Sequence, residues 1–141
     1  MMKKILALSL STAMVLSGAA TAAHHMSGPL SVKGDDQDVS AGSVTAAAVL
    51  AEKNGWLVVH RTDDNMKPGP VVGHAPLKAG MNKEVTALLT EEVKSGEKLM
   101  LMLHGEEGGM KTGLFEYSLG AKEDGPVKVD GKLVMTVITA Q

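Results

Sequence analysis

The chain has 141 residues, a formal net charge of −2 and no cysteine. This length suits a single domain, because compact domains mostly have about 100–150 residues. The lack of cysteine excludes disulfides, thiolate metal ligands and a cysteine nucleophile. A near-neutral charge with one Trp, one Tyr and one Phe argues against nucleic-acid binding, which needs a basic face and aromatic stacking platforms.

The first residues have the three-part pattern of a secretory signal peptide. Lys3 and Lys4 give a basic start, residues 5–16 are mostly apolar and residues 17–23 are small. The apolar stretch is shorter than the roughly 20 residues of a membrane span. We therefore expect a periplasmic or secreted protein with no membrane span. Its predicted segments are a signal peptide over residues 1–22, a flexible N-terminus over residues 23–29 and a β-sandwich domain over residues 30–141.

Turn sequences such as Asn54-Gly55 and Asp130-Gly131 recur along the rest of the chain, with runs rich in Val, Leu and Thr between them. This pattern predicts an all-β, antiparallel sandwich or barrel of about seven or eight strands. Residues 43–50 contain alanines that also suit a helix, but the turn that follows them favours a strand. Residues 71–74 lie between prolines, which indicates an edge strand or an extended loop.

Residues 56–61 form a predicted strand that begins apolar and ends polar. Residues 99–104 are apolar on both faces, as in a central strand that is covered on both sides. Because side chains alternate between the faces of a strand, about half of each strand points into the core. The predicted core residues are Trp56, Val58, Val85, Leu89, Leu99, Leu101, Leu103, Leu114, Val134 and Ile138.

Histidine and methionine are the residues with metal-binding chemistry. Thioether sulfur suits Cu(I), and imidazole suits either oxidation state of copper, so copper is the metal that this ligand set fits in an exported protein without cysteine. The same ligands also suit other transition metals. The candidate ligands are His60, His104, Met102, Met110, His74 and His25.

Met100, Met102 and His104 share one face of their predicted strand. Neighbours in this row are about 7 Å apart, which is too wide for three ligands of one metal ion. Met102 and His104 could converge on an ion only with help from Met110 or His60. The alternative is that Met100 and Met102 fill a core that is poor in aromatic residues.

His60 and His104 each lie at the end of a predicted strand. If the two strands are neighbours, both imidazoles reach one end of the sandwich, where His74 could join them. Such a group would form a Zn(II) or Cu(II) site. The alternative is three separate surface or capping histidines.

The N-terminus offers a site that needs no fold. Cleavage after Ala22 leaves a chain that begins with Ala23, His24 and His25. The terminal amine, two backbone amides and the His25 imidazole would then bind Cu(II) or Ni(II) in a square plane. Cleavage after Ala23 removes this arrangement.

Several short segments resemble an uncharacterised domain of unknown function that occurs in secreted and surface proteins of halophilic archaea and in exported bacterial proteins. The segments are residues 55–60 (GWLVVH), 69–74 (GPVVGH), 77–80 (LKAG), 101–104 (LMLH) and 124–127 (DGPV). The resemblance covers residues 30–139 and implies an immunoglobulin-like or cupredoxin-like β-sandwich. It implies no activity and no ligand residues.

Two functions follow from these observations. The first is a non-enzymatic exported binding or surface module whose partner is an unknown protein or small molecule, because neither a hydrolase motif nor a zinc-protease motif occurs. The second is a periplasmic binding protein for copper or another transition metal. Imidazoles of His60 and His104 that meet at one centre would favour the second function.

Overall fold

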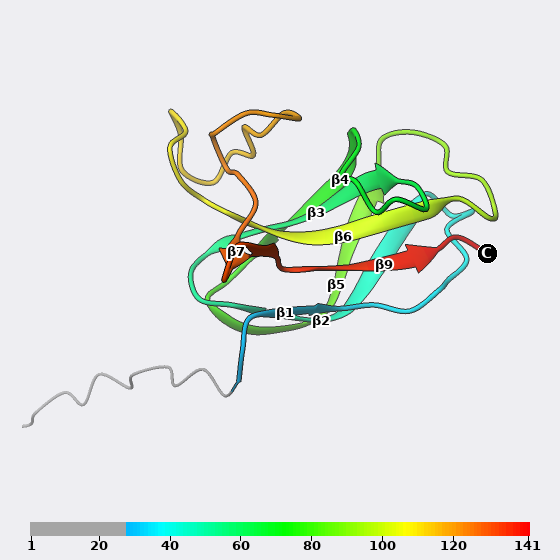
Figure 1. The fold of residues 1–141 in the computed structure, drawn as a ribbon, viewed down its shortest axis with the longest axis horizontal. Coiled ribbons are helices and arrows are strands. Elements are labelled where there is room, and N and C mark those ends of the chain that lie inside the picture. Colours follow the sequence, from blue (N-terminus) through cyan, green and yellow to red (C-terminus); the bar gives the residue numbers. More distant parts are fainter. Residues whose placement is uncertain (1–27) are drawn as a thin grey trace, which may run out of the picture.

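The computed structural model describes residues 28–141, which form nine β-strands and no helix (Figure 1). The prediction of an all-β antiparallel fold is confirmed. The predicted signal peptide lies outside the described residues. The strands are β1 (Ser31–Lys33), β2 (Ser43–Ala51), β3 (Gly55–Thr62), β4 (Val71–Leu77), β5 (Gly80–Leu89), β6 (Lys98–Gly105), β7 (Lys128–Val129), β8 (Lys132–Leu133) and β9 (Met135–Thr139).

Seven strands form one antiparallel sheet in the order β1-β2-β5-β4-β3-β6-β9, and β7 pairs with β8 in a small hairpin. The large sheet curls until its two ends lie close together, since β1 also contacts β6 and β9 (Figure 1). Just after β1, Gln37 forms a parallel bridge with Ala140, which follows β9. The result is a flattened, nearly closed barrel whose two walls pack on one another as in a sandwich.

The core lies between the two walls of this barrel. Val49 of β2 is buried in the same cluster as Leu57 of β3 and Leu101 of β6. Most predicted core residues are buried, and Val85 and Leu89 pack against the cluster from its edge. Leu114 is wrong as a core residue, because it lies in a loop outside the sheet and is 52% exposed.

Strands β3 and β6 are buried on both faces, as the apolar run at residues 99–104 predicted. Their inner faces belong to the barrel core. Their outer faces lie under two connections, residues 63–70 between β3 and β4 and residues 106–127 between β6 and β7 (Figure 1). Polar side chains on this outer face, those of His60 and His104, are therefore buried.

β4 lies inside the sheet between β3 and β5, so the prediction of an edge strand or loop is wrong. β5 pairs with β4 only at Gly73 and His74, which leaves Pro76 beyond that short ladder. Gly73 permits the close approach, because a Cβ at this position would lie 2.6 Å from the Leu88 carbonyl oxygen. A proline is tolerated where a strand has no partner on that side.

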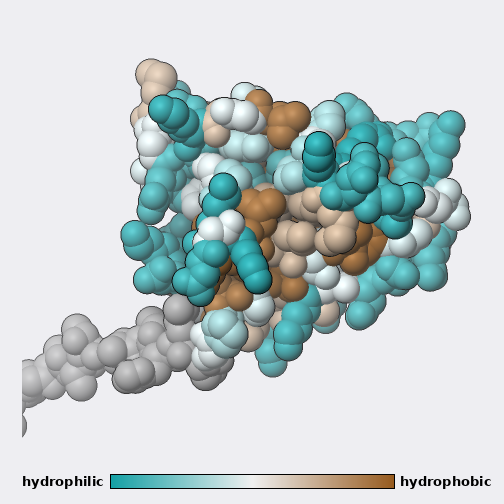
Figure 2. Space-filling view, in the orientation of Figure 1, coloured by the Kyte–Doolittle hydropathy of each residue, from teal (hydrophilic) through white to brown (hydrophobic). Residues whose placement is uncertain are grey.

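The side of the molecule drawn in Figure 2 is mostly hydrophilic. On this side, hydrophobic residues gather in a strip over β6 and β9 with hydrophilic residues around it. In the described part of the chain, no helix is long and apolar enough to span a membrane.

Candidate metal centre

His60 of β3 and His104 of β6 meet on the outer face of the sheet. Both side chains are fully buried, at 0% exposure. Their Nε2 atoms lie 3.1 Å apart, and their rings are stacked with centroids 5.2 Å apart. The structure therefore brings together the two histidines for which the sequence left a shared site open. The predicted meeting at one end of the sandwich is wrong, because the antiparallel register places His60 opposite Met100 and His104 opposite Trp56.

The strand register explains how the two rings meet. Across β3 and β6, Trp56 is opposite His104, Val58 is opposite Met102 and His60 is opposite Met100. The imidazoles thus come from diagonal corners and meet over the middle row. A β-bulge shifts the β3–β4 register between Val59 and His60. Bulges of this kind re-aim a side chain and are common next to functional sites.

Each imidazole is held from behind by a backbone carbonyl. Nδ1–H of His60 donates to the Gly69 carbonyl oxygen at 2.9 Å, and Nδ1–H of His104 donates to the Asp124 carbonyl oxygen at 2.7 Å. Carbonyl oxygens only accept, so both contacts need the proton on Nδ1. The two Nε2 atoms then face each other as lone pairs.

Two neutral imidazoles carry two N–H protons, whereas the three contacts of this pair need three. Whichever tautomers form, one contact remains between two acceptors. A metal ion between the Nε2 atoms satisfies all three contacts at once, and so does a third proton, which burial disfavours by lowering the pKa of both imidazoles. Unmet polar contacts are costly when they are buried, so this pair is poised to accept a cation.

Burial also determines the charge of the pair. Burial lowers the pKa of His104 to about 4, against a partial opposing effect of its hydrogen bond to Asp124. Burial likewise lowers the pKa of His60. Both rings are therefore neutral near pH 7, and neutral imidazole is the form that binds metals.

Two of the three aromatic residues of the chain, Phe115 and Tyr117, lie against this pair, and Trp56 packs on Phe115. The Tyr117 ring lies edge-on to His104 with centroids 4.6 Å apart and to His60 with centroids 5.9 Å apart. Phe115 lies 6.3 Å from His104 and stacks on His74 at 4.4 Å. Since Phe115 and Tyr117 both belong to residues 106–127, this connection forms the cover of the site.

Asp124 fastens that cover to the pair. Its fully buried carboxylate accepts the backbone N–H groups of Glu107 at 3.1 Å and Glu116 at 2.8 Å. Its backbone has a positive φ of 47°, a conformation that Asp adopts more readily than most residues. This turn aims the Asp124 carbonyl at His104, so one residue orients both the cover and the ligand.

Gly69 plays the matching role behind His60. Its N–H donates to the Arg61 carbonyl oxygen at 2.7 Å while its own carbonyl accepts from His60. A Cβ at Gly69 would lie 2.7 Å from that Arg61 oxygen. Glycine is thus the residue that lets the 63–70 connection approach β3 closely enough to hold the ring.

The structure places the other predicted ligands in different surroundings. Met102 is buried in the middle row, and His74 packs beside Trp56 and Phe115. Met110 is 93% exposed in the 106–127 connection. His25 lies outside the described residues. Among residues 28–141, no group of three or more His, Cys, Asp and Glu side chains could hold a metal ion, so the site rests on a histidine pair.

Two hollows adjoin the site. A pocket of about 340 Å³ reaches His104 and is bordered by Glu106, Glu107 and Lys122. A second pocket of about 440 Å³ is lined by Trp56, His74 and Phe115. Only the first pocket is lined by a member of the pair, His104, so it is the nearer surface from which an ion would approach.

Sequence reasoning missed the groups that orient and cover the pair. Asp124, Gly69, Phe115 and Tyr117 are not among the candidate ligands that the sequence predicts. The concentration of two of the three aromatic residues in one glycine-rich connection was the available signal. Because aromatic side chains dominate core energetics, two of them in one connection indicate that the connection packs against the domain.

Fold and site together define an all-β domain with a buried pair of facing histidines. A family model described as "Domain of unknown function (DUF7282)" matches residues 30–141, and the chain belongs to this family. The expected resemblance to an uncharacterised domain is thereby confirmed. No curated protein and no solved structure matches the chain.

Proposed function

We propose that this is an exported, non-enzymatic protein that binds one transition-metal ion, with copper the best fit, between His60 and His104. The observation that carries the proposal is the 3.1 Å contact between two buried Nε2 atoms whose Nδ1 atoms both face backbone carbonyls. A metal ion is the small molecule partner that this arrangement fits.

The arrangement has the features of a preorganised ligand pair. Metal-binding histidines usually donate their second ring N–H to a carbonyl or carboxylate, which fixes the tautomer and strengthens the ligand. Both rings of this pair have such a partner. Imidazole nitrogen suits copper, zinc, iron and nickel, so the pair alone defines a transition metal rather than calcium or magnesium.

Burial supports a role in holding or carrying the ion rather than in catalysis. Catalytic metals keep a coordination position open to water or substrate. Here both imidazoles are fully buried, and Phe115 and Tyr117 lie against them. Release to a partner protein in the periplasm or outside the cell would then require movement of the 106–127 connection.

The test is metal binding by the correctly processed protein and a variant with His60→Leu and His104→Leu. His24→Gln and His25→Gln are included in every protein, so that the N-terminus cannot contribute. His74→Leu is the matched control, because His74 packs in the same aromatic cluster but outside the pair. Competition titrations with Cu(I), Cu(II) and Zn(II) give stoichiometry and affinity.

We expect one equivalent of metal in the parent protein, a loss of at least about 100-fold in affinity in the double variant and little change in His74→Leu. The metal-free double variant should fold but be less stable than the parent, because the Gly69 and Asp124 carbonyl oxygens lose their donors. Equal affinity in the parent and the double variant would overturn the proposal.

A further inference from the structure

We propose that the ion is Cu(I), held in a bent three-coordinate site whose third ligand is the thioether sulfur of Met102. This inference rests on the proposed function and goes beyond it in naming the oxidation state and the third ligand. Three observations carry it: the nitrogen spacing, the strand register and the local charge.

The nitrogen spacing indicates a bent site. With metal–nitrogen bonds of about 2.0–2.1 Å, a linear arrangement needs its two nitrogens about 4.1 Å apart, whereas an angle of 120° needs only about 3.5 Å. The observed Nε2–Nε2 distance is 3.1 Å. The pair is thus about 0.4 Å from the bent geometry but about 1 Å from the linear one. A bent pair leaves one side of the ion open to a further ligand.

The register identifies that ligand. The rings cross from diagonal corners, so the row between them consists of Val58 and Met102. Paired residues of antiparallel strands point to the same face, which places Met102 on the face of both histidines. Val58 has no donor atom. Among the residues of β3 and β6 in that row, only Met102 offers a ligand, and it is fully buried.

In the two neighbouring strands, the residues opposite this row also carry nitrogen or sulfur atoms that can bind a metal. His74 of β4 is opposite Val58, and Met135 of β9 is opposite Met102. Nitrogen and thioether sulfur therefore line this face across four strands. Such soft and borderline donors prefer Cu(I), whereas the hard oxygen ligands preferred by Mg²⁺ and Ca²⁺ do not lie in the row.

Local charge favours a single positive charge. The cost of burying an ion grows with the square of its charge, so a divalent ion needs more compensation than a monovalent one. The buried carboxylate of Asp124 belongs to the residue that holds His104, and no ion pair among residues 28–141 involves it. One negative charge balances Cu(I) and leaves Cu(II) or Zn(II) with an excess charge.

The experiment compares Met102→Leu with Met100→Leu in the protein that carries His24→Gln and His25→Gln. Leucine conserves the volume of methionine, so both variants should fold. Met100 is the matched control, because it is equally buried on the same strand face but lies beside His60 rather than between the rings. Affinities for Cu(I), for the redox-inert probe Ag(I) and for Zn(II) are measured anaerobically by competition, and thermal melting reports folding.

We expect Met102→Leu to weaken Cu(I) and Ag(I) binding by at least about tenfold, to change Zn(II) binding less than twofold, and to leave the melting temperature within a few degrees. Met100→Leu should match the parent for all three ions. X-ray absorption of the Cu(I) form should show one sulfur and two nitrogen neighbours in the parent, and no sulfur in Met102→Leu.

Undiminished Cu(I) binding in Met102→Leu would refute the third ligand while leaving the histidine pair as the metal site. Tighter binding of Zn(II) than of Cu(I) in the parent would refute the assigned ion. Absence of binding by any of the three ions in the folded parent would refute the proposed function itself.

Discussion

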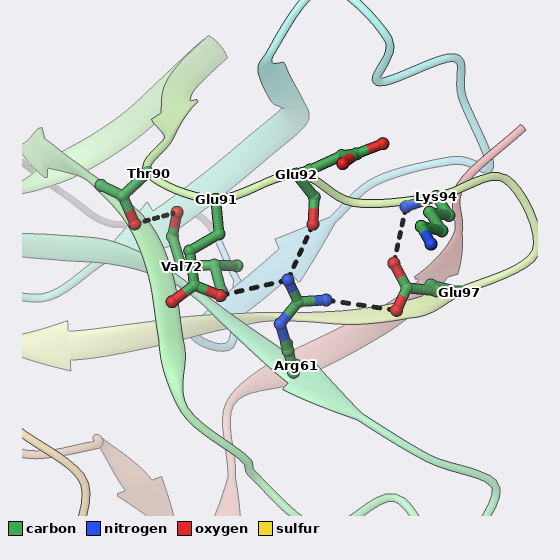
Figure 3. Close-up of polar contacts among 7 residues, drawn as sticks. All are labelled: Arg61, Val72, Thr90, Glu91, Glu92, Lys94 and Glu97. Atoms are coloured by element: carbon green, nitrogen blue, oxygen red, sulfur yellow. Dashed lines mark hydrogen bonds and ion pairs between the residues drawn. The ribbon is translucent and has the colours of Figure 1, made fainter.

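His60 and Arg61 are neighbours on β3, yet they form two very different polar clusters. His60 points to the outer face and meets His104, where both rings are fully buried. Arg61 donates to the Glu91 carboxylate at 3.1 Å, the Glu92 carbonyl at 2.8 Å and the Glu97 carboxylate at 3.3 Å (Figure 3). In that cluster every acceptor faces a donor.

The Arg61 cluster has a structural role, whereas the histidine pair has the features of a binding site. Figure 3 shows that Glu97 also accepts the Lys94 backbone N–H, so the Arg61 cluster fixes the connection between β5 and β6. One guanidinium faces two partly exposed carboxylates, and such pairs contribute little to stability and are weakened by salt. The histidine pair is buried with one contact between two acceptors. A bound ion is one arrangement that would satisfy such a buried contact.

The two clusters should differ most in how acid changes the stability that each one contributes. In the unfolded chain His104 has its ordinary pKa of 6.5, whereas burial lowers its pKa to about 4 in the folded protein. Between these values the unfolded state binds more protons, so stability is complete above pH 6.5 and falls as the pH drops. We expect the metal-free protein to lose roughly 3 kcal/mol from His104 by pH 4. Urea denaturation from pH 7.5 to pH 4 measures this loss.

The control is the variant with His60→Leu and His104→Leu, which retains every carboxylate and the Arg61 cluster. Its stability should depend less steeply on pH in this window. Parallel curves for the two proteins would contradict the assignment of neutral, buried imidazoles.

Gly69→Ala should have the next largest effect. The added Cβ would lie 2.7 Å from the Arg61 carbonyl oxygen, which pushes the Gly69 carbonyl away from His60. We expect a loss of about 1–3 kcal/mol in the free energy of unfolding. Metal affinity should fall by about 10–100-fold, because the ring loses the acceptor that orients it.

Gly105→Ala is the matched control for this change. It lies next to His104, but the closest neighbour of its added Cβ is Glu107 Cγ at 3.9 Å, so the methyl group fits. Its metal affinity should equal that of the parent. Unchanged affinity in Gly69→Ala would show that the carbonyl behind His60 is dispensable.

Arg61→Lys should have the smallest effect. Lysine keeps the charge but cannot reach two carboxylates and a carbonyl with a planar fork. The expected cost is below about 1 kcal/mol, and added salt should diminish it. Metal affinity should not change, since Arg61 lies on the opposite face from the pair. A large loss of metal affinity would mean that the two clusters are coupled through β3.

The strands were predictable because their signals are local. Alternating Val and Leu, with Asn-Gly and Asp-Gly turns, indicate strands regardless of their partners. The placement of β4 was not predictable, because the prolines that favour an edge are tolerated where its ladder with β5 is short. Strand neighbours depend on long-range pairing, which local sequence does not contain.

The same limit applies to the site. His60 and His104 were recognisable as ligand types at strand ends, but they are 44 residues apart and their meeting depends on the β3–β6 register. Asp124 and Gly69 act through backbone carbonyls, a role that no side-chain motif reveals. Only the folded backbone shows which carbonyl faces which ring.

The most direct measurement of the central claim is nitrogen NMR of the imidazoles during titration with Ag(I) or Cu(I). The account predicts that one equivalent shifts the Nε2 signals of His60 and His104 together, while both Nδ1 atoms keep their protons. Unchanged signals of His60 and His104, with a response only from His24 and His25, would contradict it.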